Sequence, residues 1–279
     1  MDARPQQHAE PGTGGDPAAA TPDAAESRAA DQGLAEGYLQ AAVRLLETVR
    51  EREGERIREA GRLVADTVEN GGRLFAFGAG HSSLPAQDLV YRAGGLAVWN
   101  LLGVPGAVGV DVRPATLGSA LELVDGLAST VLDQSPAESG DLLVVISLSG
   151  RNPLPVEMAA HARERGLRVV AVTSLAYADS TRSRHSSGTF LKDHADLVID
   201  NQVAVGDAEL SLEGVDAPFG PASTVVVSAI MQAVTASAAG TLRHRGITPP
   251  LLRSGNVDGG HEWNARLMRS YRDRLYYGH

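Results

Sequence analysis

The stretch LLVVISLSGRNP, residues 142–153, decides the fold. It opens with the expected strand Leu142–Ser147, a short apolar run of the kind that is typical of a strand buried on both faces of a parallel sheet. A loop with two serines and a glycine follows, and Asn152 stands at the expected N-cap of a helix that ends at Gly166. Hydroxyl groups and the free N–H groups of a helix N-terminus bind anions, so this loop is a candidate anion site at the carboxyl end of a strand.

A second loop of the same kind comes earlier in the chain, where FGAGHSS, residues 77–83, follows the apolar run Leu74–Gly78. Its glycines let the backbone approach an anion closely. The loop begins like the dinucleotide fingerprint G-x-G-x-x-G but lacks the third glycine, so the sequence argues against a dinucleotide site. Two such loops at neighbouring strand ends favour an anion-binding site over ordinary turns and helix caps.

The rest of the chain predicts one α/β domain with a helix in front of it. Further strands are expected at Leu96–Leu101, Arg168–Thr173 and Leu197–Asp200, and helical segments at Leu34–Asn70, Ser223–Arg245 and Asn264–Tyr277. We therefore expect a three-layer α/β/α fold with a mainly parallel five-stranded sheet and an N-terminal helical extension. Residues 34–279 are predicted to form this single domain. Residues 1–33, which mix Pro, Gly, Ala and Asp, are predicted to be a disordered tail.

Composition and charge exclude several classes of function. The 279 residues carry a formal net charge of −9, which argues against nucleic-acid binding. The chain has no cysteine, which rules out disulfides, thiolate catalysis and cysteine-ligated zinc. The histidines lack the spacing of a metal motif. No uncharged apolar run reaches the roughly 18 residues of a membrane span and the N-terminus lacks a signal-peptide core, so we expect a cytoplasmic protein without membrane contact.

Gly-x-Gly-x-Ser after the first strand, with Ser-x-Ser-Gly-x-Asn about 65 residues later, resembles the SIS (sugar isomerase) domain family. The similarity covers roughly residues 34–265 and is to single-SIS-domain bacterial phosphosugar-binding proteins formerly grouped as uncharacterised. It implies that the ligand is a small sugar phosphate. The positions that it assigns to the phosphate are Ser82, Ser83, Ser147, Ser149 and Asn152, and the other expected contacts are Gly80, His81 and Asn256.

The resemblance also implies three possible activities. SIS proteins are aldose–ketose isomerases, lyases that eliminate a group from C3 of an amino sugar, or non-catalytic phosphosugar sensors. Both enzyme classes begin when a base removes the C2 proton, which is acidified by the neighbouring carbonyl, and no cofactor or metal is required. The candidate acids and bases are Glu262, His261, Glu122 and Asp88. Glu122 is expected to begin a helix. For both Glu122 and Asp88, the alternative interpretation is a solvated position on the protein surface.

The segment SGNVDGGHEWN, residues 254–264, favours the lyase. It resembles the Asn-x-Asp-Gly-Gly stretch of lyases that cleave amino-sugar ethers, and in SIS dimers the C-terminal loop commonly reaches a neighbour's site. The rival interpretation is a capping segment in which Asp258 or Asn264 caps the last helix. Arg92 stands near the place where those lyases carry a glutamate. This difference weakens the expectation that the chain shares their substrate specificity more than the expectation that it shares their reaction type.

We therefore predict a dehydratase or lyase acting on an amino-sugar 6-phosphate such as N-acetylglucosamine 6-phosphate. The alternatives are a phosphosugar isomerase or a sensor. A homodimer or homotetramer is expected, because the apolar face of the helix at Leu34–Asn70 needs a partner and the fold usually pairs across its helices.

Overall fold

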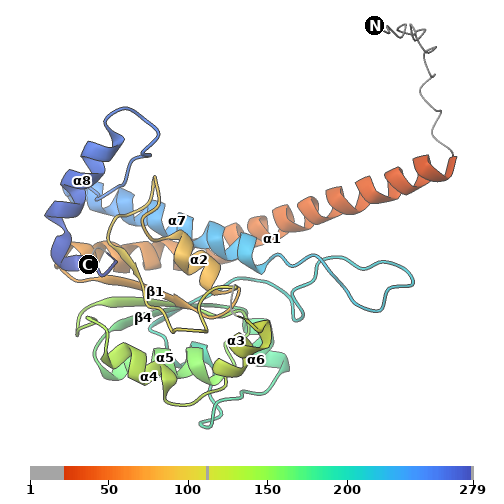
Figure 1. The fold of residues 1–279 in the computed structure, drawn as a ribbon, viewed down its shortest axis with the longest axis horizontal. Helices are drawn as coiled ribbons and strands as arrows, with labels where there is room; N and C mark the ends of the chain where they lie inside the picture. Colours follow the sequence, from red (N-terminus) through yellow and green to blue (C-terminus); the bar gives the residue numbers. More distant parts are fainter. Residues whose placement is uncertain (1–21, 111–112, 278–279) are drawn as a thin grey trace, which may run out of the picture.

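Five short apolar runs form one parallel sheet in the computed structural model, which describes residues 22–110 and 113–277 (Figure 1). The strands are β1 (Leu74–Gly78), β2 (Trp99–Leu101), β3 (Leu142–Ile146), β4 (Arg168–Thr173) and β5 (Leu197–Asp200), in the order β2-β1-β3-β4-β5. All neighbouring pairs are parallel. Since β1 and β3 are buried at every position, each carries an unbroken apolar run and not an alternating one. The predicted parallel five-stranded sheet is confirmed.

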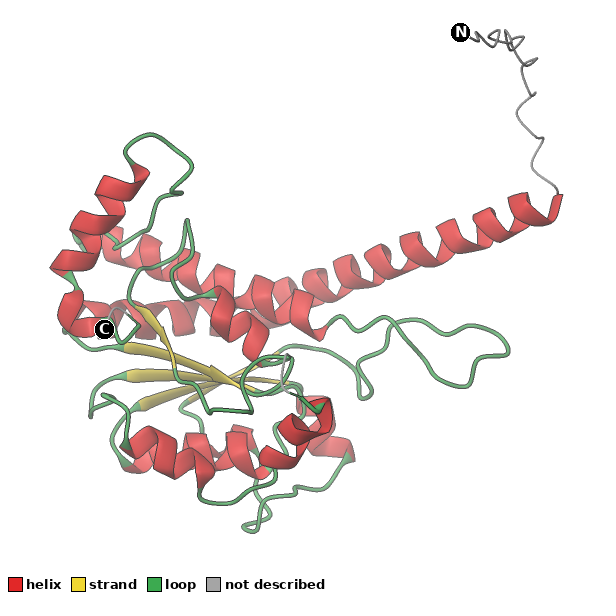
Figure 2. Cartoon of the chain, in the orientation of Figure 1, coloured by secondary structure: helices red, strands yellow, loops and turns green. Residues whose placement is uncertain are grey.

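Helices cover both faces of this sheet, which gives the three predicted layers (Figure 2). One face carries α1 (Pro22–Glu69), α2 (Ser83–Asp88) and α7 (Ser223–His244), and the other carries α3 (Ala115–Leu121), α4 (Leu127–Asp133), α5 (Pro153–Glu164) and α6 (Leu175–Ser180). Two apolar clusters fill the spaces between the layers. One holds Leu74 and Ala76 of β1 with α1 and α7, and the other holds Phe75 and Phe77 of the same strand with α4 and α5.

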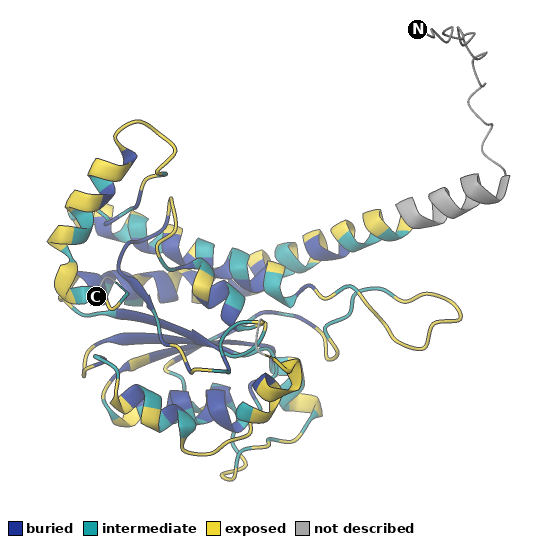
Figure 3. Cartoon of the chain, in the orientation of Figure 1, coloured by how far each residue is buried: buried dark blue, intermediate teal, exposed yellow. Residues whose placement is uncertain are grey.

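Helix α1 begins earlier than the sequence predicts. It starts at Pro22, within the segment expected to be a disordered tail, and continues without a break to Glu69. Residues 1–21 of that segment lie outside the described residues. The C-terminal part of α1 packs along α7 over the sheet, whereas residues 33–40, nearer the start of the helix, are exposed or half-buried (Figure 3).

Within the described residues, α7 is the one helix long and apolar enough to cross a membrane by length and composition alone. Its serines, threonines and glutamine interrupt the apolar run without adding charge. Its buried residues, among them Val226, Ile230 and Val234, belong to the cluster beneath α1. Packing inside the domain thus accounts for the apolar face of this helix.

Two predicted elements have different boundaries. Strand β2 starts at Trp99, because Leu96 pairs with Leu251 in an isolated antiparallel bridge and not with β1. The last long helix is α8 (Gly260–Ser270), followed by a short 3-10 turn at Arg272–Arg274. Another 3-10 turn, Leu191–His194, precedes β5.

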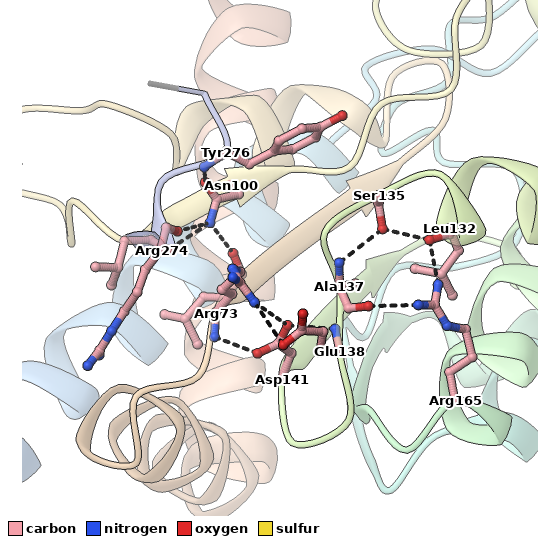
Figure 4. A network of polar contacts seen from close by, with 12 residues as sticks. Arg73, Asn100, Leu132, Ser135, Ala137, Glu138, Asp141, Arg165, Arg274 and Tyr276 are labelled. Atoms are coloured by element: carbon pink, nitrogen blue, oxygen red, sulfur yellow. Dashed lines mark hydrogen bonds and ion pairs between the residues drawn. The ribbon is translucent and has the colours of Figure 1, made fainter. Parts of the chain in front are cut away.

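Buried polar side chains tie the C-terminal segment to the amino-terminal edge of the sheet (Figure 4). The amide of Asn100 donates to the carbonyl oxygens of Leu74 (3.1 Å) and Arg274 (2.9 Å), and its oxygen accepts from the N–H of Tyr276. Nearby, the carboxylate of Asp141 accepts from the N–H of Arg73 at 2.7 Å. These bonds stabilise one edge and leave the opposite edge, at the carboxyl ends of the strands, for a ligand.

Candidate functional site

A pocket of about 620 Å³ opens at the carboxyl ends of β1 and β3. These two strands are neighbours, and the chain leaves them toward opposite faces of the sheet, through α2 after β1 and through α5 after β3. Such a switch point is where open parallel sheets bind their ligands. Both serine loops line the pocket, as the sequence predicts, together with the start of α7.

The first loop is a tight turn that presents His81 and Ser82 to the pocket. A Cβ on Gly78 would overlap the carbonyl group of Ser82, so this position requires glycine, and Gly80 has a positive φ of 52°. Ser83 is buried and faces away from the pocket. Its hydroxyl donates to the carbonyl oxygen of Gly80 at 2.6 Å and accepts from the N–H of Gly109 and the amide of Gln87. Ser83 therefore braces the loop, although the sequence assigns it to the phosphate.

The second loop presents Ser147 and Ser149 to the same pocket. Gly150, with a positive φ of 57°, turns the chain so that its N–H donates to the hydroxyl oxygen of Ser147 at 3.2 Å. Asn152 stands at the N-cap of α5 as predicted, but its side chain makes no capping hydrogen bond. It is used inside the pocket instead.

The start of α5 does not offer the free N–H groups that the sequence analysis expects. Pro153 and Pro155 have no N–H, and the N–H of Leu154 donates to the carbonyl oxygen of Glu122 at 3.1 Å. The first turn of this helix therefore offers the pocket no free N–H group, and the donors that line the pocket include serine hydroxyl groups and arginine side chains.

Glu122 is one of two carboxylates that line the pocket, with Asp207. It follows the end of α3, so it terminates a helix and does not begin one as predicted. Its Oε2 accepts from the amide of Asn152 at 2.7 Å, and its Oε1 lies 3.4 Å from the place of a Cβ on Gly80. Burial raises the pKa of Glu122 above its ordinary value of 4.5, although the bond from Asn152 and the charge of Arg184 act in the opposite direction. A carboxyl group with a raised pKa is suited to proton transfer.

Four predicted site residues lie elsewhere in the chain. Asp88 pairs with Arg92 and accepts from the amide of Gln232, so it joins α2 to α7. Asn256, His261 and Glu262 are exposed on the last loop and on α8. Figure 1 shows α8 at the left of the view, above the sheet, and α3 and α6 below the sheet. None of these four residues lines the pocket described here.

The rival interpretation of the last loop is wrong for Asn264. Its side-chain oxygen accepts from the N–H of Arg253 and its amide donates to the carbonyl oxygen of the same residue, both at 2.8 Å. Asn264 lies inside α8, and the N-cap is Gly259. In the described ranges no three His, Asp or Glu side chains are grouped to hold a metal ion.

Two arginines that are not among the predicted site residues also line the pocket. Arg151 is in the second loop, and Arg184 comes from the loop between β4 and β5. The N–H of Arg184 donates to the carbonyl oxygen of Arg151 at 2.8 Å, and its guanidinium donates to the side-chain oxygen of Asn152 at 3.3 Å. Arg184 follows no periodic pattern. The one sequence feature that points to Arg184 is its position after β4, the strand beside β3.

Comparisons with known proteins identify relatives of this chain. A family model described as "SIS domain" matches residues 37–174. The chain is 70% identical over 244 residues to a "UPF0309 protein" of Streptomyces avermitilis, which covers 88% of this chain and 97% of the relative. It is 39% identical over 239 residues to a UPF0309 protein of Listeria innocua, with coverage of 85% and 96%. Among solved structures, phosphoheptose isomerase GmhA from Neisseria gonorrhoeae aligns with a TM-score of 0.48 at 17% identity, covering 75% of this chain and 97% of that one.

Proposed function

The chain belongs to the UPF0309 family of SIS-domain proteins, and from this premise we propose that it is a phosphosugar enzyme. Its substrate is an amino-sugar 6-phosphate such as N-acetylglucosamine 6-phosphate, and its reaction is elimination of the C3 substituent. The observation that carries this proposal is one pocket in which Ser82, Ser147 and Ser149 lie with a half-buried carboxyl group, Glu122, and an imidazole, His81.

In this mechanism Glu122 removes the C2 proton of the open-chain sugar. The electron pair of the C2–H bond is delocalised onto the carbonyl oxygen as an enolate. The enolate then collapses, the C2–C3 double bond forms and the C3–O bond breaks. His81 gives its proton to the leaving oxygen, so that a 3-hydroxyl group departs as water. Elimination needs a base and a separate acid, and the first loop and the end of α3 supply one of each.

The experiment is proton NMR of the protein with N-acetylglucosamine 6-phosphate in heavy water. We expect the C2 proton signal to disappear and a vinylic resonance to appear. The variant Glu122→Gln should lose at least about 100-fold in rate, the lower end of what general-base catalysis contributes. Glu262→Gln is the matched carboxylate control and should retain turnover, because Glu262 is exposed on α8 and does not line the pocket.

Other outcomes reject parts of the proposal. Deuterium uptake at C2 without a vinylic signal, or a ketose product, makes the protein an isomerase. An unchanged spectrum with saturable broadening of the sugar signals makes it a sensor. If Glu262→Gln abolishes turnover and Glu122→Gln does not, the base comes from the last loop. If both variants are inactive alone and activity recovers when they are mixed, the last loop acts in a second subunit.

A further inference from the structure

We propose that Arg151 and Arg184 bind the phosphate group of the substrate and supply the positive charge that α5 does not. The inference rests on the proposed function, since it names residues that recognise the dianionic phosphate in the same pocket. Both arginines line that pocket beside Ser147 and Ser149.

The start of α5 lacks free N–H groups that could bind a phosphate. A helix N-terminus ordinarily offers unbonded N–H groups and a partial positive charge to a phosphate. Here Pro153 and Pro155 remove two of these N–H groups, and Leu154 uses a third on the carbonyl oxygen of Glu122. A phosphate dianion over this loop requires another source of charge.

The guanidinium groups of Arg151 and Arg184 are available to bind a ligand. Within residues 22–110 and 113–277, neither Arg151 nor Arg184 forms an ion pair with a carboxylate. The Nε of Arg151 is buried and has no hydrogen-bond partner in the same ranges. An unsatisfied buried donor is destabilising, whereas a phosphate oxygen would satisfy it with a charge-assisted bond.

Within the described residues, the two carboxylates that line the pocket, Glu122 and Asp207, form no ion pair with either arginine. Asn152 stands between Arg184 and Glu122, accepting from the first at 3.3 Å and donating to the second at 2.7 Å. The carboxylate of Asp207 accepts from the N–H groups of Ala222 and Ser223 at the start of α7. The guanidinium of Arg184 therefore keeps donors for a ligand, and its main-chain bond to Arg151 places the two charges on adjoining loops.

The test uses isothermal titration with glucitol 6-phosphate, which has no carbonyl group and so binds without reacting. We expect Arg151→Gln and Arg184→Gln each to weaken binding about 10-fold or more, as the loss of a hydrogen bond to a charged group predicts. Arg184→Lys should retain part of the affinity, because it keeps the charge but loses the planar fork. Arg182→Gln is the matched control, since Arg182 is exposed on the same loop and does not line the pocket.

Glucitol 6-sulfate, a monoanion, distinguishes charge recognition from general damage to the site. The wild-type protein should prefer the phosphate to the sulfate, and both glutamine variants should lose most of this preference and of the sensitivity of binding to added salt. Unchanged phosphate affinity in both variants, with folding verified by circular dichroism, overturns the inference and leaves the proposed function intact. Failure of the wild-type protein to bind any sugar phosphate rejects the proposed function itself.

Discussion

Replacing Gly78 with alanine tests whether the backbone of the first loop must approach β1 as closely as the structure has it. A Cβ at this position would overlap the carbonyl oxygen of Ser82 and lie 2.5 Å from its carbonyl carbon and 2.8 Å from the nitrogen of Ser83. All three are backbone atoms, which cannot rotate away as a side chain can. Since ordinary contact begins at 3.4 Å, the loop must move by about 1 Å.

This displacement sets the expected magnitudes. Overpacking of a well-packed site costs about 1–3 kcal/mol, and a clash with backbone belongs at the upper end of that range. For a chain of this size, about 3 kcal/mol lowers Tm by about 6–12 °C. Ser82 moves with the loop, so its hydroxyl loses a hydrogen bond to the charged phosphate, and binding should weaken by about 10-fold or more.

Thermal unfolding and titration with glucitol 6-phosphate measure the two effects. Gly103→Ala is the control, because Gly103 follows β2, is exposed and has no atom within 4 Å of the place of a Cβ. Its Tm and affinity should match those of the wild-type protein, since exposed substitutions usually change stability by less than about 0.5 kcal/mol. The reasoning is refuted if Gly78→Ala is as stable and binds as tightly as Gly103→Ala.

Three further predictions concern α1 and Glu122. Gly61→Ala should lower the free energy of unfolding, because its Cβ would lie 2.6 Å from Cβ of Ser237 on α7. Gly54→Ala in the same helix should raise the free energy of unfolding by about 1 kcal/mol, because alanine favours the helix and its Cβ has room. Chemical denaturation of the two variants measures both changes. If Glu122 is the base, kcat/KM should rise with pH through a pKa above 4.5, because the base must be ionised. Because the pKa of Glu122 is raised in the folded state, the stability that Glu122 contributes is present at low pH and lost as the pH rises through that pKa. Glu122→Gln should therefore gain stability relative to the wild-type protein over that pH range, which denaturation at several pH values measures.

The strands could be predicted because each is a continuous apolar run in a sheet with two covered faces. Leu74–Gly78, Arg168–Thr173 and Leu197–Asp200 have the predicted bounds. The prediction for β2 was too long, because Leu96 is as buried as a strand residue but bonds to Leu251 and not to β1. An apolar run reports burial, and burial alone does not say which neighbour supplies the hydrogen bonds.

The site was predictable where it depends on local sequence. Glycine and serine after a strand mark a loop that admits an anion, and Ser82, Ser147 and Ser149 line the pocket accordingly. Glu122 was named among four candidates, but nothing near it in sequence distinguishes a pocket wall from a solvated helix end. Arg184 was missed for the same reason, since its role depends on the folding of one loop over another.

Asn152 links the two tasks of the pocket. Its side chain donates to the carboxylate of Glu122 at 2.7 Å and accepts from the guanidinium of Arg184 at 3.3 Å. A direct ion pair between Arg184 and Glu122 would lower the pKa of the carboxyl and occupy the guanidinium at once. The neutral residue between them takes the place of that ion pair, and burial still raises the pKa of Glu122 although the bond from Asn152 and the charge of Arg184 lower it. Under the proposed function, the asparagine is therefore used to separate charges, and neither the cap nor the phosphate contact predicted from its sequence position describes that role.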